Sequence, residues 1–174
     1  VLGGRPVPGG ALEMRAPGDA LRHPLILAML VLWAVNDHVL KDLYANGWTG
    51  KLSDLAGLAV FPLIPFCAYE MMCALRGRAP HHARTLLGLS LLATGVFLIA
   101  VNTSEVCADA FRVGLAAAQW PFQGLWSLAV VGEGLPGLSP VHHTLDPTDI
   151  LTLPALLIPW WVVTKSASPR DSTE

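Results

Sequence analysis

Two neighbouring stretches, Asn36-Asp37-His38-Val39-Leu40-Lys41 and Gly50-Lys51-Leu52-Ser53-Asp54, decide the fold of this chain. The first ends an apolar run that begins at Pro24, and the second opens the next apolar run. A charged side chain costs about 2.5–3.5 kcal/mol at the centre of a bilayer and less near its surface. Charges in this position therefore indicate a transmembrane helical hairpin whose polar end lies at the membrane surface.

The composition of the whole chain supports a membrane protein. Of the 174 residues, 53% are apolar and 14% are charged, whereas a soluble domain carries about 25% charged residues. The formal net charge of −2 gives no basic surface for nucleic acid. The three cysteines form neither a metal-binding spacing nor a disulfide framework. We therefore predict an all-α polytopic membrane protein that needs no cofactor and contacts membrane lipids.

We predict four transmembrane helices and one interfacial or re-entrant segment. Apolar runs of about 18–20 residues, at 1.5 Å per residue, just cross a hydrocarbon core of ~30 Å. Pro62 and Pro65 predict a kink in the second run, and Gly88 and Gly95 predict close helix approach in the third. The predicted parts are a flexible tail 1–20, a membrane domain 21–165 with spans at about 22–41, 53–75, 85–102 and 147–164 and an interfacial segment 106–131, and a polar tail 166–174.

Two helix starts carry residues that are typical of helix caps. Ser53 is expected to be the N-cap of the second span, with Asp54 in the first turn at the positive end of the helix. Asp146 is expected to be the N-cap of the last span, followed by Pro147 at the first helical position and Asp149 in the first turn. The aromatic stretch from Trp120 to Trp126 contains Pro and Gly and is expected to interrupt helix.

The distribution of basic residues predicts the orientation. Of the 11 lysines and arginines, eight lie in the two tails, at Arg22, at Lys165 or in the loop 76–84, and three lie on the opposite side. The positive-inside rule then places both termini in the cytoplasm. We expect the protein in a bacterial inner membrane.

This topology collects polar side chains from three spans on the exoplasmic side. Because the first hairpin and the start of the last span meet there, we expect Asp54 to lie close to Asp146 or Asp149. The predicted ligand-binding residues are Asn36, Asp37, His38, Lys41, Lys51, Ser53, Asp54, Asp146 and Asp149.

Several chemistries fit these residue types. Lys41 and Lys51, with nearby helix N-termini, could bind a phosphate or carboxylate, such as the headgroup of an anionic lipid. The carboxylates with a histidine could hold a divalent ion, although the spacing matches no zinc signature. A serine–lysine nucleophile is conceivable at Ser53, but no nucleophile motif surrounds it. In the structural alternative, Asp37 and Lys41 form an intrahelical ion pair and the other acids only cap helices.

Two short motifs carry a resemblance to a known family. Ser53-Asp54 and Asp146-x-x-Asp149-Ile150-Leu151 each open a predicted helix, and the chain resembles the VanZ-like membrane proteins of bacteria in these positions. Asn-Asp-His-x-x-Lys and Gly-Lys-x-Ser-Asp are also similar to motifs of other small multi-span bacterial inner-membrane proteins. The resemblance implies a small helical membrane protein with a connection to the cell envelope and identifies no reaction.

The sequence thus leaves two classes of function open. In the first, an exoplasmic polar site binds the headgroup of a lipid or of a cell-envelope precursor. In the second, the chain is a non-catalytic accessory or structural membrane subunit. Neither class decides whether the protein is an enzyme.

Overall fold

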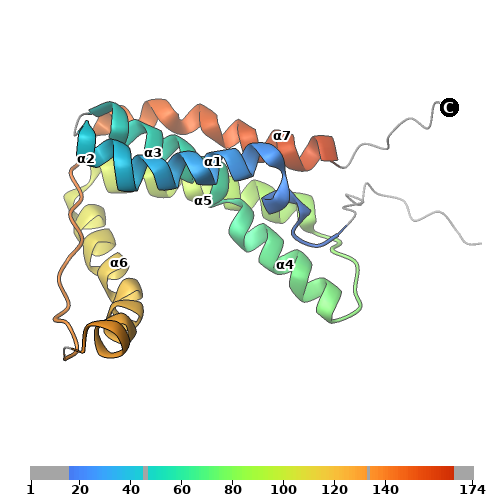
Figure 1. Ribbon diagram of the computed structural model, residues 1–174. Coiled ribbons are helices and arrows are strands. Elements are labelled where there is room, and N and C mark those ends of the chain that lie inside the picture. Colours follow the sequence, from blue (N-terminus) through green and yellow to red (C-terminus); the bar gives the residue numbers. More distant parts are fainter. Residues whose placement is uncertain (1–15, 45–46, 133, 167–174) are drawn as a thin grey trace, which may run out of the picture. The chain divides into compact units, whose positions relative to one another are not determined.

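The computed structural model describes residues 16–44, 47–132 and 134–166, and every regular element among them is a helix (Figure 1). This agrees with the predicted all-α class. The tails predicted at 1–20 and 166–174 lie mostly outside the described residues. The elements are η1 Asp19–Arg22, α1 Pro24–Val35, η2 Asn36–Leu40, α2 Lys41–Leu43, α3 Gly47–Val60, α4 Leu63–Leu75, α5 Ala83–Thr103, α6 Glu105–Trp126, η3 Ser127–Val131, η4 Pro147–Leu156 and α7 Leu157–Ser166.

The chain forms two compact units. Unit 1 contains Val1–Gly95 and Thr152–Glu174, and unit 2 contains Val96–Leu151. Three helices in the described part are long and apolar enough to cross a membrane, namely Gly47–Leu75, Ala83–Thr103 and Pro147–Lys165. Pro24–Leu40 is a shorter apolar helix.

The first helix begins at Pro24, close to the predicted start of the first span at about residue 22. Pro24 takes the first helical position, where its missing N–H costs no hydrogen bond. The His23 Nδ1 atom caps this end by accepting a bond from the Leu25 N–H at 3.2 Å. The helix α1 then packs along α3, and the rings of Trp33 and Phe61 meet edge to face at 5.1 Å.

The second span begins earlier than predicted. The helix α3 starts at Gly47, so Ser53 lies inside the helix and the prediction that it is an N-cap is wrong. The Ser53 hydroxyl is bonded to a side chain of the first helical segment. A serine that bonds across to another helix cannot be distinguished by sequence from one that caps its own helix.

The second span is interrupted between α3 and α4, at the place where its prolines predict a kink. The helix α3 ends at Val60, and α4 begins at Leu63 directly after Pro62. Pro65 has no N–H to bond the Phe61 carbonyl, which instead accepts the Ile64 N–H at 3.1 Å. The break is therefore a local rearrangement of hydrogen bonds caused by the two prolines.

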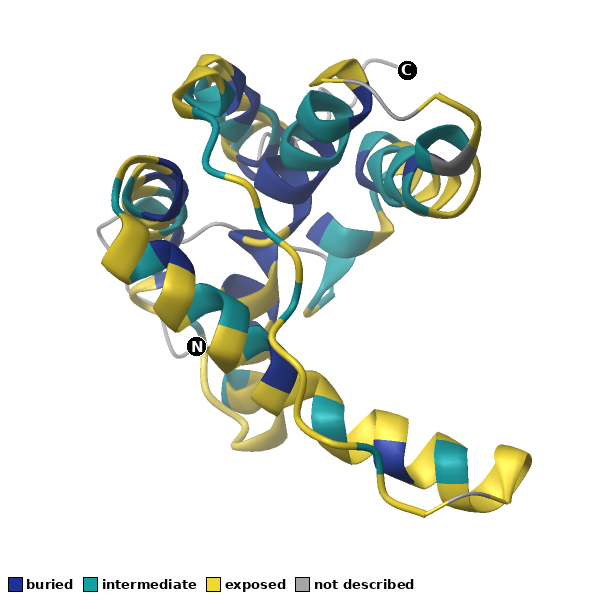
Figure 2. Cartoon of the chain, turned by 90° about the vertical axis from the view of Figure 1, so that its left-hand side faces the viewer, coloured by how far each residue is buried: buried dark blue, intermediate teal, exposed yellow. Residues whose placement is uncertain are grey.

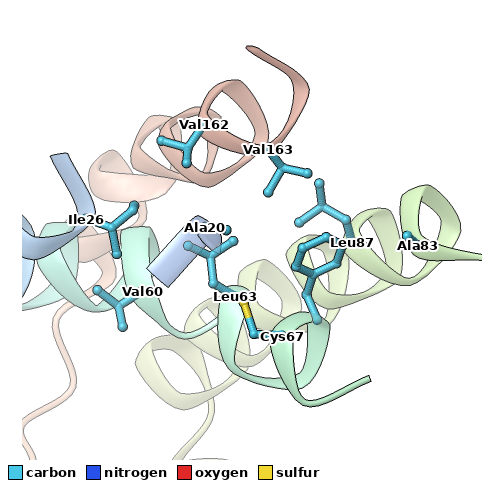
Figure 3. Close-up of a cluster of buried hydrophobic side chains, with 10 residues drawn as sticks. Ala20, Ile26, Val60, Leu63, Cys67, Ala83, Leu87, Val162 and Val163 are labelled. Atoms are coloured by element: carbon cyan, nitrogen blue, oxygen red, sulfur yellow. The ribbon is translucent and has the colours of Figure 1, made fainter. Parts of the chain in front are cut away.

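The apolar core of unit 1 brings α1, α3, α4, α5 and α7 together around η1 (Figure 3). The sequence predicts a flexible tail over 1–20, but Ala20 in η1 is 1% exposed. The prediction is therefore wrong for residues 16–20. A left-handed turn at Gly18 brings η1 onto the core, where the Gly18 N–H donates to Glu70 Oε2 at 3.2 Å. The buried side chains of this cluster are Ala20, Ile26, Val60, Leu63, Phe66, Cys67, Ala83, Leu87, Val162 and Val163.

One predicted small residue marks a close approach between helices. A Cβ atom at Gly95 in α5 would lie 3.2 Å from Leu156 Cδ1 and 3.5 Å from Leu153 Cδ2 of η4. A Cβ atom at Gly88 would meet nothing within 4 Å. Gly95 therefore lets α5 and η4 pack closely, whereas Gly88 does not have this role.

Unit 2 consists of the end of α5, the long helix α6 with η3, and an extended return segment. The helix continues through Pro121 to Trp126, so the predicted interruption at Trp120–Trp126 is wrong. One proline removes one N–H donor from a helix, and the remaining turns continue the ladder. Figure 2 shows that most of the surface of α6 is exposed.

Candidate functional site

The polar end of the first hairpin is built on a π-helical turn. The segment η2, Asn36–Leu40, follows α1 without a break, and the Lys41 N–H bonds to the Asn36 carbonyl five residues earlier. A π turn holds one more residue than an α turn and occurs frequently at functional sites. The wider turn buries Asn36 completely, at 0% exposure, and leaves His38 exposed.

Asn36 fastens this turn to α3. Its Nδ2 atom donates to the Thr49 carbonyl at 2.6 Å and to Ser53 Oγ at 2.7 Å. The buried Asn36 Oδ1 atom has no hydrogen-bond partner in the part of the chain that the structure describes. The two donated bonds explain why a fully buried amide is tolerated at the end of an apolar helix.

Asp37 joins the same network from the outer side of the turn. Its Oδ1 atom accepts the Ser53 hydroxyl proton at 2.6 Å and lies 2.7 Å from Lys41 Nζ. The side chains of Asp37 and Lys41 are 34% and 41% exposed, so water screens their attraction. We call Asn36, Asp37, Lys41, Thr49 and Ser53 the polar node.

The node has consequences for the chemistry of Ser53. Its hydroxyl proton is bonded to Asp37, and its oxygen accepts a bond from Asn36. Lys41 pairs with the carboxylate of Asp37, so the geometry gives no support to a serine–lysine nucleophile. Ser53 serves here as a bridge between α3 and the first helical segment.

Lys51 and Asp54 lie on the same helix, α3, on either side of Ser53, and both are half-buried. The positive end of this helix is at Gly47, six residues before Ser53. The sequence predicts that the helix N-terminus at Ser53 contributes to an anion site. This is wrong, because the first-turn N–H groups of α3 follow Gly47 and not Ser53.

The remaining two predicted site residues belong to unit 2. Asp146 Oδ1 accepts the Thr148 N–H at 2.9 Å and the Thr148 hydroxyl at 2.6 Å, which is the expected local cap. The helix that follows is 3₁₀ in form over Pro147–Leu156 and contains Pro154. Asp149 lies in its first turn, as predicted.

Unit 2 also contains contacts that the sequence did not predict. Arg112 in α6 donates to the His143 carbonyl through Nε at 3.0 Å and through Nη2 at 2.6 Å. His143 Nε2 lies 3.2 Å from the Val101 carbonyl, and its ring meets Phe111 edge to face at 5.3 Å. The neighbouring His142 is exposed, so only the second of the two adjacent histidines is part of this packed contact.

No metal centre is formed by the residues that the structure describes. Among them, no group of three or more histidines, cysteines, aspartates or glutamates is close enough to hold a metal ion. The structure therefore lends no support to the divalent-ion hypothesis, and the polar node remains the best-defined site of unit 1.

Comparisons with known proteins add no further assignment. No family model matches the chain, and no curated protein or solved structure is significantly similar to it.

Proposed function

We propose that this chain is a four-span bacterial inner-membrane protein whose polar node binds an anionic headgroup at the exoplasmic surface. In this topology the shorter helix Pro24–Leu40 crosses the membrane in addition to the three long apolar helices. The segment 106–131 is interfacial, and both termini are cytoplasmic. The eight-to-three asymmetry of lysine and arginine supports this orientation. The headgroup would belong to a membrane lipid or to a lipid-linked cell-envelope precursor.

One observation carries the proposal, namely the position of Lys41. Its side chain is 41% exposed, and its ammonium group is paired with Asp37 at the end of an apolar helix. An ammonium group has three N–H donors, and an exposed one can bind a phosphate while it keeps one bond to a carboxylate. Lys51 on the adjacent helix adds a second positive charge to this end of unit 1.

A specific observation favours the alternative that the chain is a structural or accessory subunit. The distance of 2.7 Å between Lys41 Nζ and Asp37 Oδ1 is that of a complete ion pair. The bonds from Asn36 and Ser53 close the network within the protein. A node that exists only to join two helices would look the same.

Reversing the ion pair separates the two functions. Lys41→Met leaves Asp37 without its ion pair, and we expect the free energy of unfolding to fall by about 1 kcal/mol or less because the pair is partly solvated. The double variant Asp37→Lys, Lys41→Asp restores the pair but moves the positive charge by about one helical turn, ~5–6 Å. We therefore expect the double variant to regain stability without regaining lipid binding.

The measurements are unfolding in detergent and retention of phosphatidylglycerol relative to phosphatidylcholine by the full-length protein in native mass spectrometry. Lys165→Met removes an exposed lysine from α7 and is the matched control for non-specific attraction of anionic lipid. If the double variant retains phosphatidylglycerol as well as the wild type does, the anion site is refuted and the structural alternative stands.

A further inference from the structure

Unit 2 contains a hairpin whose two ends are tied together. The helix α6 leaves α5 at Ser104, and the chain returns along an extended segment to Asp146. The Asp146 N–H donates to Asn102 Oδ1 at 3.4 Å, and His143 contacts the Val101 carbonyl. The hairpin therefore starts and finishes at one place, which is the end of a helix apolar enough to cross a membrane.

The charged side chains of α6 gather at its start, and Glu133 follows the far end of the hairpin in the sequence. Glu105, Asp109 and Arg112 lie in the first turns of α6, where Arg112 approaches both acids and also holds the His143 carbonyl. From Val113 to Gly132 the sequence has no charged residue and no histidine. The polarity of the hairpin therefore changes along its length.

The far end of the hairpin exposes large apolar side chains. Phe122 is 74% exposed and Trp126 is 63% exposed. We call this group the apolar tip, and its members are Phe122, Leu125, Trp126, Leu128, Val130 and Val131. An exposed apolar group of this size marks a surface that binds either lipid or protein.

The return segment limits how deep the tip can lie. It is bonded to α6 from Trp120 Nε1 to the Pro136 carbonyl at 2.8 Å, and to η3 from Ser127 Oγ to the Gly134 carbonyl at 2.9 Å. Leu135 and Leu138 are exposed, and the backbone between them forms neither helix nor strand. Such backbone, where it faces hydrocarbon, leaves polar groups unsatisfied at several kcal/mol each. Such a segment is tolerated among headgroups and water but not at the bilayer centre.

We infer that the apolar tip inserts into the interfacial layer of the same bilayer that the apolar helices cross. The continuity of the hairpin base with the candidate spans before and after it favours lipid as the partner. Tryptophan prefers the headgroup level of a bilayer, where its ring is apolar on one side and hydrogen-bonded on the other. This inference rests on the chain being a membrane protein and does not depend on the anion site at Lys41.

Nitroxide labels on the full chain in lipid vesicles test the depth of the tip. Single cysteines are introduced at Val130 in the tip, at Val106 beside the charged base and at Leu92 in α5, all of which are exposed. Cys67, Cys73 and Cys107 are first replaced by alanine. Collision rates with oxygen and with a water-soluble nickel chelate then report depth.

We expect the Val130 label to collide several-fold less often with the nickel chelate than the Val106 label does. We also expect it to collide less often with oxygen than the Leu92 label does. A nickel rate equal to that at Val106 would place the tip in water, and low rates with both reagents would show that protein covers it. A depth equal to that of Leu92 would show a re-entrant segment in the hydrocarbon. Each of these three results overturns the inference, and a Phe122→Cys label on α6 itself must give the same order.

Discussion

Replacing Asn36 by leucine tests whether the polar node joins the first two apolar helices. The substitution keeps a side chain of similar size and removes the two donated bonds, to the Thr49 carbonyl at 2.6 Å and to Ser53 Oγ at 2.7 Å. Asn36 is fully buried, so water cannot replace these bonds. The variant therefore measures the contribution of the bonds to the stability of unit 1.

The expected loss follows from the number of bonds and from what remains after they are lost. A side-chain hydrogen bond between membrane helices contributes about 0.6 kcal/mol on average and about 1.7 kcal/mol at most. Two bonds then contribute about 1–3 kcal/mol. Ser53 keeps its bond to Asp37 in the variant, and the unpartnered Asn36 Oδ1 is removed without a loss. We therefore expect a loss in the lower half of this range, about 1–2 kcal/mol.

The measurement is reversible unfolding of the full-length protein in mixed micelles with increasing SDS, and the control is Thr94→Val. Among the residues that the structure describes, the Thr94 hydroxyl bonds only within its own helix, to the Ser90 carbonyl at 2.8 Å, so its removal should change stability by no more than a few tenths of a kcal/mol. A stability of Asn36→Leu equal to that of wild type, or above it, would refute the conclusion that the node joins the two helices.

Two further predictions concern packing and topology. Gly95→Val should destabilise unit 1 by about 1–3 kcal/mol, as overpacking does, because its new Cβ atom would lie 3.2 Å from a leucine of η4. Gly88→Val, where nothing lies within 4 Å, should have a smaller effect in the same unfolding assay, and equal effects would contradict the assignment of the close contact. Reporter fusions at Asn46 and after Glu174 should report opposite sides of the membrane, and the same side for both would exclude the proposed four-span topology.

Local sequence patterns were sufficient to predict the class of fold. Long apolar runs with few charges indicate membrane helices, because a charge in hydrocarbon is costly whatever surrounds it. Pro62 and Pro65 lack the N–H donors that a regular helix needs, and the interruption between Val60 and Leu63 lies where they predict a kink. The start of the first helix at Pro24 follows in the same way. Pro121, by contrast, lies inside α6 without interrupting it.

The sequence was less informative where a side chain can form a hydrogen bond either within its own helix or to another helix. Serine is a residue type typical of helix caps, yet the Ser53 hydroxyl donates a hydrogen bond to Asp37 on another helix. Asp37 and Lys41 are four residues apart, so their pairing at 2.7 Å was a local property and was predicted as one of two alternatives. The involvement of Asn36 with Thr49 required knowledge of how the two helices face each other.

What the sequence alone determined is therefore the helical class, the apolar runs, the kink at Pro62 and Pro65 and the cap at Asp146, because these depend on neighbours within a few positions along the chain. Only the tertiary structure decided the π turn at Asn36–Leu40, the burial of Asn36 and the hydrogen bonds from Arg112 to the His143 carbonyl. Each of these arises from hydrogen bonds between groups at least 13 positions apart, or from a turn widened so that such bonds can form. A linear pattern does not encode which distant donor meets which acceptor, because that is fixed by the packing of apolar side chains between them.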